Sequence, residues 1–523
     1  MKIACIGGGP GGLFFAALVK QADPTIEIVV YERNHWDDTF GFGVVFSDAT
    51  LSRLVAADPV LAGRLSNFGE YWEQIAVRLK GEELVCGGNG MAAITRKQLL
   101  ILLADRALEA GVNIRWEHEV ASLDEVADAD LVVLANGANS RIRSELSSVL
   151  TPQIDVATAK FIWFGTTYRF NGLTFLFEES EHGVFAVHGY PISPDVGTFI
   201  VETDEETWRK AGLDAFDPLE PSGPSDEDSQ RYLETLFAGQ IEGHRLLANN
   251  SRWGNFRTIR TASWHWKNVV LLGDAAHTAH FSVGSGTKMA MEDAAELVQQ
   301  LMAHPTDLSA ALGAYEAERR PNVDRIQGAA GPSLAWWEHF GDHYRAMPPA
   351  QFAFHFLTRA ISHDRISRRD PAFVASVHRW WQQEHGDDPL SGEVALASLG
   401  PVPRRADVRS ASDGAMVAEF ANGMSLPLVT AASTGNQPWG LLVGASGLDR
   451  RSVARGSRPE LLAVAGGTPS SRRAACEALR LSSDLPVMLV DDELSDDRAL
   501  TVILSGRADL VGSRRTGSAV SAA

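Results

Sequence analysis

Three glycines near the N-terminus, Gly7, Gly9 and Gly12, have the spacing of a turn that binds a pyrophosphate. In such a turn the first glycine permits the bend, the second lets the backbone approach the phosphates, and the third allows a helix to pack against the preceding strand. An apolar segment over residues 2–7 precedes the turn, and a helical pattern over residues 11–21 follows it. The N-terminus of that helix would offer free N–H groups to the phosphates. The pattern therefore predicts a dinucleotide site.

Three charged residues are candidates to complete this site. Glu32 ends the next apolar segment about 20 residues after Gly12, where an acid accepts the ribose hydroxyls of a dinucleotide. Arg33 follows it directly, and Arg96 opens a later helical segment from which it can reach the adenosine or the pyrophosphate. We expect all three side chains to contact the cofactor.

A second motif distinguishes a flavin from a nicotinamide. The sequence GDAAH over residues 273–277 directly follows an apolar strand, and an acid such as Asp274 at a strand end can bond the ribityl hydroxyls of FAD. Gly284 and Gly286 then provide bare backbone on which an isoalloxazine ring can rest. The helix that follows, with Thr287 in its first turn, directs its N–H groups to the O2/N1 side of the flavin, where negative charge accumulates on reduction. The motif predicts FAD as the cofactor.

Taken in order along the chain, these motifs resemble those of the single-component aromatic flavoprotein hydroxylases, the class of 4-hydroxybenzoate hydroxylase. A middle motif of that family, usually Asp-Gly-x-x-Ser-x-x-Arg, is Asn-Gly-Ala-Asn-Ser-Arg-Ile-Arg over residues 136–143. In the family this motif contacts both FAD and NAD(P)H. Asn136 keeps the capacity for hydrogen bonding but lacks the charge, which affects the usual role of the acid and not the fold.

Longer blocks are similar to the hydroxylase half of the salicylyl-CoA 5-hydroxylase and anthraniloyl-CoA monooxygenase group. These blocks are residues 41–51, 256–266, 273–294 and 315–338. The resemblance implies NADH or NADPH as a transient reductant, O2 as co-substrate, and hydroxylation through a flavin C4a-hydroperoxide of an aromatic ring, with an aryl-CoA thioester such as salicylyl-CoA (5-hydroxylation) as the small-molecule substrate. It also places Gly43 and Val44 beside the edge of the flavin.

Four residues are candidates for the substrate pocket. His188 and Tyr190 lie two positions apart in a predicted strand and therefore share one face of it. His280 and Phe281 follow the GDAAH motif, where this class usually has a proline. Either histidine can orient a phenol or aniline and help to remove a proton, although a packed core histidine explains each of them equally well.

The expected fold is α/β: a Rossmann-like FAD-binding domain interleaved with an antiparallel-sheet substrate domain, as in 4-hydroxybenzoate hydroxylase, plus a small C-terminal α/β module. Residues 486–514 are similar to the last strands of an old-yellow-enzyme-like barrel, so the module is interpreted as a degenerate barrel remnant, with a thioredoxin-like tail as the alternative. In chain order we expect a first FAD-binding segment (1–154), the substrate sheet (155–257), a second FAD-binding segment (258–345), a helical extension (346–390), a linker (391–415) and the C-terminal module (416–523).

Composition excludes several classes of protein. The 523 residues carry a net charge of −19, which argues against a nucleic-acid partner. The three cysteines form no CxxC pair, so we expect neither a disulfide framework nor a metal site, and a cytoplasmic location. The sequence has no run of about 20 apolar residues, so we expect no membrane span. Nothing in the sequence specifies an oligomeric state.

Three alternatives remain open at this point. One keeps the fold and changes the substrate to a free aromatic amino acid or a carrier-bound natural-product intermediate. Another is a non-catalytic FAD-binding protein, suggested by Asn136. A flavin halogenase is disfavoured, because the Trp264-His265-Trp266 segment lacks the Ile-Pro ending of the halogenase motif and directly precedes the GDAAH strand.

Overall fold

The computed structural model describes residues 1–39, 41–216, 225–284, 286–359, 361–410, 416–430, 437–445, 458–492 and 494–514. The chain divides into two compact units. Unit 1 contains residues 1–83 and 88–341, and unit 2 contains residues 84–87 and 342–523. Each unit has its own apolar core. The domain boundaries expected from the sequence stay a prediction, and the site residues described below lie in unit 1.

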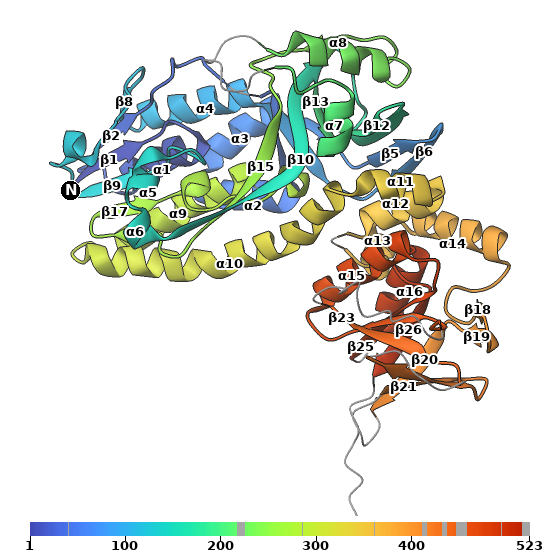
Figure 1. The fold of residues 1–523 in the computed structure, drawn as a ribbon. Coiled ribbons are helices and arrows are strands. Elements are labelled where there is room, and N and C mark those ends of the chain that lie inside the picture. The colour runs from blue at the N-terminus through green and yellow to red at the C-terminus, as the bar shows by residue number, and fades with distance from the viewer. Residues whose placement is uncertain are drawn as a thin grey trace, which may run out of the picture. The chain divides into compact units, whose positions relative to one another are not determined.

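A six-stranded sheet forms the first layer of unit 1, in the order β16-β17-β9-β1-β2-β8 (Figure 1). Its strands are β16 (His265–Trp266), β17 (Val269–Leu271), β9 (Leu131–Leu134), β1 (Lys2–Ile6), β2 (Glu27–Tyr31) and β8 (Asn113–Arg115). β17, β9, β1, β2 and β8 pair in parallel. The helices α1 (Pro10–Ala22), α4 (Arg96–Glu109) and α9 (Gly286–Ala303) bury apolar side chains in the same core as this sheet.

The register of these strands gathers the predicted cofactor residues. Ile6 pairs with Tyr31 on one side and with Leu134 on the other, and Leu134 pairs with Leu271. Because parallel strands end at the same edge of a sheet, the residues that follow each of them lie near one another. The glycine turn, Glu32, Asn136 and Asp274 therefore share one edge although they are far apart in sequence.

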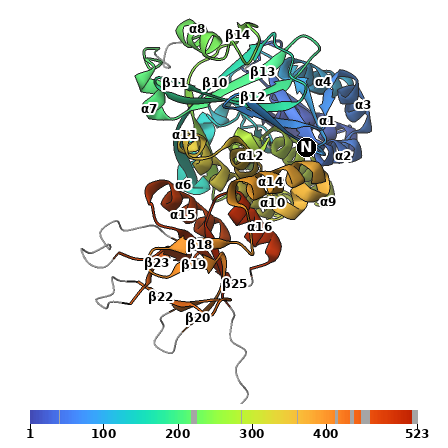
Figure 2. The ribbon, with the colours of Figure 1, turned by 90° about the vertical axis from the view of Figure 1, so that its right-hand side faces the viewer.

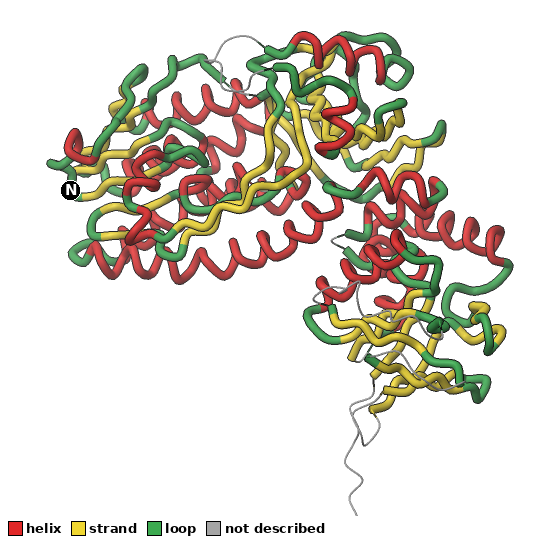
Figure 3. The backbone as a smooth tube through the Cα atoms, in the orientation of Figure 1, coloured by secondary structure: helices red, strands yellow, loops and turns green. Residues whose placement is uncertain are grey.

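A second, eight-stranded sheet is mostly antiparallel, in the order β14-β10-β13-β12-β11-β5-β6, with β15 also paired to β10. Its strands are β10 (Pro152–Thr166), β11 (Leu173–Ser180), β12 (Gly183–Pro191), β13 (Gly197–Thr203), β14 (Leu246–Leu247), β15 (Gly254–Thr261), β5 (Ile75–Leu79) and β6 (Glu82–Cys86). The long strands β10 and β15 run side by side (Figure 3).

The two faces of this sheet differ in composition, because side chains alternate along each strand. One face packs on α8 (Glu227–Leu236) and its neighbours through Ile162, Phe164, Leu176, Phe185, Val187, Phe199 and Val201. The other face carries aromatic and polar side chains that the register places together: Phe161, Trp163, Phe175, Phe177, His188, Tyr190, Ile200 and Glu202. We call this second set the aromatic face.

Shorter elements complete unit 1. A three-stranded sheet contains β3 (Gly43–Ser47), β7 (Met91–Thr95) and β4 (Glu70–Trp72). The remaining helices are α2 (Asp48–Ala57), α3 (Pro59–Phe68), α5 (Arg141–Glu145), α6 (Ser147–Leu150), α7 (Glu205–Lys210) and α10 (Leu308–Trp337), with 3-10 turns η1 (Leu123–Val126), η2 (Gly273–Ala275) and η3 (Phe281–Val283). The C-terminal end of α10 packs on the aromatic face, where Trp337 stacks on Phe177 with ring centroids 6.2 Å apart.

Unit 2 combines helices with a closed barrel, whose strands are visible in Figure 2. The helices are α11 (Phe340–Ala346), α12 (Pro349–Leu357), α13 (His363–Arg369), α14 (Pro371–His385), α15 (Pro469–Ser482) and α16 (Asp496–Leu504). A hairpin, β18 (Glu393–Leu396) and β19 (Gly400–Pro403), precedes the barrel. The barrel strands are β20 (Arg405–Ser410), β21 (Met416–Phe420), β22 (Ser425–Val429), β23 (Gly440–Gly444), β24 (Leu462–Ala465), β25 (Val487–Asp492) and β26 (Leu510–Arg514).

The closed barrel can be compared with the sequence interpretations of the C-terminal residues. A closed barrel agrees with the barrel remnant and excludes the thioredoxin-like tail. Apolar side chains including Val408, Leu426 and Met488 form a core among its strands, as in other small barrels. The described part of residues 391–415, expected to be a linker, contains the β18–β19 hairpin and the first barrel strand. These strands are only four to six residues long, so each gives a weak signal in sequence.

Candidate active site

The glycine turn between β1 and α1 has two kinds of glycine. Gly7 has φ +115°, and a Cβ at this position would lie 2.3 Å from the carbonyl oxygen of Ala135. A Cβ on Gly12 would lie 2.1 Å from the carbonyl oxygen of Gly7. A Cβ on Gly9, by contrast, would meet no atom within 4 Å, and no side chain caps the N-terminus of α1 at this residue. Gly7 and Gly12 thus serve the packing of the chain, whereas Gly9 leaves room for a ligand.

This difference gives a paired prediction. We expect Gly9→Ala to lower FAD affinity about tenfold or more, because an added methyl in a filled contact costs about 1–3 kcal/mol. The stability of the FAD-free protein should be unchanged, since the methyl enters open space. Gly12→Ala should instead destabilise the FAD-free protein by about 1–3 kcal/mol or more. Flavin absorbance after dialysis and urea unfolding of the FAD-free proteins separate the two. Equal FAD retention by Gly9→Ala and the wild type would contradict the placement of the phosphates at Gly9.

Glu32 lies where the sequence analysis expects it and already braces the turn. Its Oε2 accepts the Gly8 N–H at 2.6 Å, and its Oε1 accepts the backbone and side-chain N–H groups of Asn34 at 2.9 and 2.7 Å. The carboxylate therefore joins the end of β2 to the glycine turn. Its contact with a ribose stays a prediction, as does that of the exposed Arg33.

The Asn136 motif is tied to the GDAAH motif by a buried arginine that the sequence analysis did not select. Arg143, which is 2 % exposed, donates to the carbonyl oxygens of Ala138 at 2.7 Å and Ala275 at 3.1 Å. The Ser140 Oγ accepts the Arg143 backbone N–H at 3.2 Å and so caps α5. The Oδ1 of Asn136 is buried and has no hydrogen-bond partner among the described residues. It is positioned to accept a hydrogen bond from a bound group.

Asp274 and Arg96 approach each other from different parts of the sequence. Burial lowers the pKa of the Arg96 guanidinium, and Asp274 and Tyr190 act in the opposite direction. Asp274 reaches solvent, yet the pKa of its carboxyl is raised, because desolvation by the surrounding protein outweighs the opposing effects of His277 and Arg96. The Arg96 backbone N–H also donates to the carbonyl oxygen of Phe42 at 2.8 Å, and Gly43 pairs with Thr95. The 41–44 loop is therefore held beside Arg96.

A buried acid on α9 holds the GDAAH turn in place. Asp293 Oδ2 accepts the Gly273 N–H at 3.1 Å and lies 2.8 Å from His277 Nε2, and its Oδ1 accepts from Arg319 Nε at 2.8 Å. Burial would raise the pKa of Asp293, but His277 and Arg319 outweigh it and lower the pKa. Asp293 was not predicted from the sequence, and its contacts orient the strand end that carries Asp274.

These residues fit FAD. The open space at Gly9, the uncapped start of α1 and the unpartnered Asn136 Oδ1 suit a pyrophosphate and ribityl chain. A Cβ at Gly284 or Gly286 likewise meets no atom within 4 Å, which suits a ring resting against bare backbone. Thr287 lies in the first turn of α9. When bound, FAD supplies hydride acceptance from a nicotinamide and activation of O2.

The four predicted substrate residues gather on the aromatic face. His188 and Tyr190 share that face, as their spacing predicts. Phe281 packs edge-on against His188 at 5.4 Å and contacts Phe161 at 5.1 Å. His280 lies beside Phe281, with ring centroids 4.2 Å apart. The sheet and the loop after GDAAH thus bring all four together, and they add the buried Glu202, which lies between the two histidines.

Tyr190 packs within the aromatic face and bonds the 41–44 loop. Its hydroxyl donates to the carbonyl oxygen of Gly43 at 3.3 Å, and its ring stacks with Trp72 at 6.2 Å. Burial raises the pKa of Tyr190 to about 12, against the opposing effects of Thr198 and Arg96. Val44, the next residue of β3, is buried in the core of the parallel sheet. At neutral pH Tyr190 is therefore a hydrogen-bond donor that fixes the 41–44 loop, and not a base.

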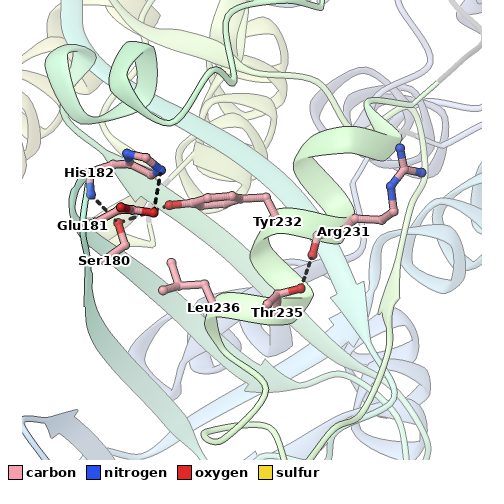
Figure 4. Close-up of a pocket in the computed structure, with 7 residues that line it drawn as sticks. All are labelled: Ser180, Glu181, His182, Arg231, Tyr232, Thr235 and Leu236. Carbon is pink, nitrogen blue, oxygen red and sulfur yellow. Dashed lines mark hydrogen bonds and ion pairs between the residues drawn. The ribbon is translucent and has the colours of Figure 1, made fainter.

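One open pocket lies elsewhere in unit 1. It has a volume of about 450 Å³ and is formed by Ser180, Glu181, His182, Arg231, Tyr232, Thr235 and Leu236 (Figure 4). Tyr232 packs on Phe185, whose side chain lies on the α8 side of the sheet. The pocket is therefore on the side of the sheet opposite to His188 and Glu202, and we assign no chemistry to it.

The chain is similar to known flavin-binding proteins in both sequence and fold. A family model described as an FAD binding domain matches residues 1–330. The chain is 50% identical to salicyloyl-CoA 5-hydroxylase of a Streptomyces species over 98% of this chain and 99% of that protein. It is 36% identical to the 3-hydroxy-4-methyl-anthranilyl-(aryl-carrier protein) 5-monooxygenase of Streptosporangium sibiricum, over 65% of this chain and 90% of that protein. The solved structure of 2-methyl-3-hydroxypyridine-5-carboxylic acid oxygenase has the same fold, with a TM-score of 0.53 at 20% identity over 69% of this chain and 98% of that one.

The fold, the family match and the 50% identical relative define an FAD-dependent monooxygenase, a class for which NADH or NADPH is the usual reductant. The chain belongs to the family of the FAD binding domain that its first 330 residues match. The fold class, the enzyme class and the cofactor predicted from the sequence are thereby confirmed. Among the residues that the structure describes, no helix is long and apolar enough to cross a membrane.

Proposed function

We propose that this protein hydroxylates the aromatic ring of salicylyl-CoA at position 5, using FAD, NADH or NADPH, and O2. The observation that carries this proposal is the 50% identity to a salicyloyl-CoA 5-hydroxylase over nearly the whole of both chains, unit 2 included. The relative named for a carrier-bound substrate matches 65% of the chain and leaves about a third of it without a counterpart. The extent of the match therefore favours a CoA thioester over a carrier-bound substrate.

The chemistry of the substrate supports a base on the aromatic face. Position 5 of a salicylyl group is para to its hydroxyl, so removal of the hydroxyl proton increases the electron density of the carbon that is oxidised. The thioester withdraws electrons from the same ring, which makes that activation more important. His280 and His188 supply the imidazole groups at this face, and imidazole is the side chain that most often acts as a general base.

The cofactor contacts are also included in the proposal. The pyrophosphate would lie at Gly7, Gly9 and Gly12, with Glu32 and Arg33 at the adenosine side. Arg96, Asn136 and Asp274 would bond the central region of FAD. Gly43, Val44, Gly284, Gly286 and Thr287 would surround the ring system. Phe281 and the aromatic face would exclude water from the ring that is oxidised.

The test compares thioesters of one aromatic acid. Purified holoenzyme is given salicylyl-CoA, the N-acetylcysteamine thioester of salicylate, the salicylyl thioester of a carrier protein and free salicylate. NAD(P)H oxidation and product are then measured together. We expect salicylyl-CoA to give the highest kcat/KM, by about tenfold or more over the truncated thioester, since one lost contact region costs about 1–3 kcal/mol. Equal or better turnover of free salicylate, or of the same acyl group on a carrier protein, contradicts the CoA assignment.

We further propose that the enzyme acts in the cytoplasm. Cys5, Cys86 and Cys476 are free and buried, which agrees with a reducing compartment. NAD(P)H and CoA thioesters are also intracellular metabolites. Fractionation of the producing cells, followed by the hydroxylase assay, tests this location.

A further inference from the structure

A buried carboxylate lies between the two histidines of the aromatic face. Glu202 on β13 is 1 % exposed, and His188 and His280 are 4 % and 2 % exposed. Glu202 Oε1 lies 2.5 Å from His188 Nε2, and Oε2 lies 3.4 Å from His280 Nε2. The rings of Phe281 and Trp337 pack on His188 at 5.4 and 4.4 Å. The three ionisable groups therefore interact in a place with little water, where charge interactions are strong.

The hydrogen bonds continue from His280 to the loop that follows GDAAH. His280 Nδ1 lies 2.8 Å from Ser282 Oγ, and the Ser282 backbone N–H donates to the same Nδ1 at 3.4 Å. Ser282 Oγ in turn lies 3.0 Å from Ser333 Oγ on α10. Because Nδ1 accepts from the Ser282 N–H, the ring proton of neutral His280 belongs on Nε2, which faces Glu202. The lone pair of His280 Nδ1 thus points to Ser282, which is half-buried.

The carboxylate keeps its negative charge in this setting. Burial by itself would raise the pKa of Glu202, but the interactions of its two oxygens with His280 and His188 outweigh burial and lower it to about 2. An ionised acid beside a histidine fixes the tautomer of the ring and stabilises the imidazolium that forms when the ring gains a proton. His188, on the other carboxylate oxygen, holds Glu202 in place.

We propose that Glu202 is the positioning residue that sets His280 to receive, through Ser282, the hydroxyl proton of the substrate. This inference rests on the proposed function, because it needs a substrate that carries a ring hydroxyl. Nothing in the sequence motifs or in the names of the relatives assigns Glu202 a role. His280 is the proton acceptor, and Glu202 acts only through it.

The proton transfer balances without a further reactant. The substrate O–H bond breaks, and its proton moves to Ser282 Oγ as the hydroxyl proton of Ser282 moves to His280 Nδ1. The electron pair stays on the substrate oxygen as a phenolate. His280 becomes an imidazolium with protons on both ring nitrogens, and its new charge faces Glu202. Nothing is oxidised or reduced in this step.

The test reads the ionisation of the bound substrate without turnover. Salicylyl-CoA is titrated into the oxidised holoenzyme, with benzoyl-CoA as the reference that lacks the hydroxyl, and the difference absorption of the phenolate is recorded. We expect a phenolate band for the wild type and for Glu206→Gln, an exposed residue of α7 whose ion pair is with Lys210. Glu202→Gln, which keeps the shape but loses the charge, should lose at least nine-tenths of the band.

A second readout follows turnover. In Glu202→Gln we expect hydroxylated product per NAD(P)H to fall at least tenfold, with H2O2 making up the difference, while KM changes little. If Glu202→Gln fails to retain FAD, Ser282→Ala carries the test, because it removes one hydroxyl from a partly exposed loop and should also lose the band. A full phenolate band and full coupling in both variants overturn the inference. If the wild type neither binds nor hydroxylates salicylyl-CoA, the proposed function is wrong, and the proton transfer through Ser282 to His280 is wrong with it.

Discussion

Replacing Asp293 by alanine is expected to lower the free energy of unfolding by about 3–5 kcal/mol, the usual cost of removing one partner from a buried ion pair. Asp293 is fully buried and accepts from Gly273, His277 and Arg319. Without the carboxylate, the Arg319 guanidinium stays buried and keeps only its bond to Glu292. The Asp293→Ala change also leaves the Gly273 N–H without its carboxylate acceptor, at the turn that carries Asp274.

The same variant should therefore lose FAD more readily than a variant of equal stability. Urea unfolding of the FAD-free protein measures the first effect, and flavin released by dialysis measures the second. Glu318→Gln is the matched control, since Glu318 is an exposed neighbour of Arg319 on α10 and its change should stay within about 0.5 kcal/mol. A loss of stability below about 1 kcal/mol for Asp293→Ala contradicts the anchoring role, given the desolvation cost of an unpaired buried cation.

The cofactor edge was predictable because its signals are local. A glycine turn, an acid after β2 and GDAAH after β17 each belong to one strand end, and parallel pairing places all strand ends at one edge. The two histidines were selected for a similar reason: His188 lies on a strand with clear alternation, and His280 closely follows a motif. Each inference used only a short stretch of neighbouring residues.

The supporting residues were missed because their partners are distant in sequence. Glu202 is 14 residues from His188 and 78 from His280, and only the strand register brings the three together. Two weak signals were present. Glu202 is the one charged residue of the segment GTFIVET, and Asp293 lies between Met289 and Leu297 on the buried stripe of α9. An acid in a buried position needs a partner, which marks both as residues to examine.

In unit 2 the pairing of the barrel strands could not be predicted from the sequence. The similarity of residues 486–514 to barrel strands was informative, yet the first barrel strand, β20, fell inside the predicted linker. A strand of six residues that pairs in parallel with β26, more than 100 residues later, has no local signal for its partner. Closure of the barrel depends on that pairing, so it could be seen only in the structure.

Replacing Arg507 by methionine is expected to destabilise unit 2 by about 3 kcal/mol, since three hydrogen bonds of a buried cation are lost together. Arg507 is 2 % exposed and donates to Glu477 Oε1 at 2.5 Å, Thr358 Oγ1 at 2.7 Å and the carbonyl oxygen of His355 at 2.8 Å. It thereby joins α12 and α15 to the turn before β26. Arg409→Met is the control, because Arg409 is exposed and, among the residues that the structure describes, its ion pair is with Glu419 on the barrel surface.

The pH dependence of the two variants distinguishes this role from simple packing. Burial, followed by the charges of Arg507 and His343, holds the pKa of His355 well below its ordinary value. In the unfolded chain His355 binds a proton near pH 6.5, whereas in the folded chain it stays neutral at this pH. The wild type therefore loses stability as pH falls from about 7 to 5. In Arg507→Met the repelling cation is gone, and Glu477, 3.9 Å from His355 Nε2, is released to attract a proton. The loss of stability between pH 7 and 5 should then be smaller than in the wild type or Arg409→Met. Urea unfolding followed by circular dichroism at both pH values measures it, and an unchanged slope in Arg507→Met would show that Arg507 does not act on His355.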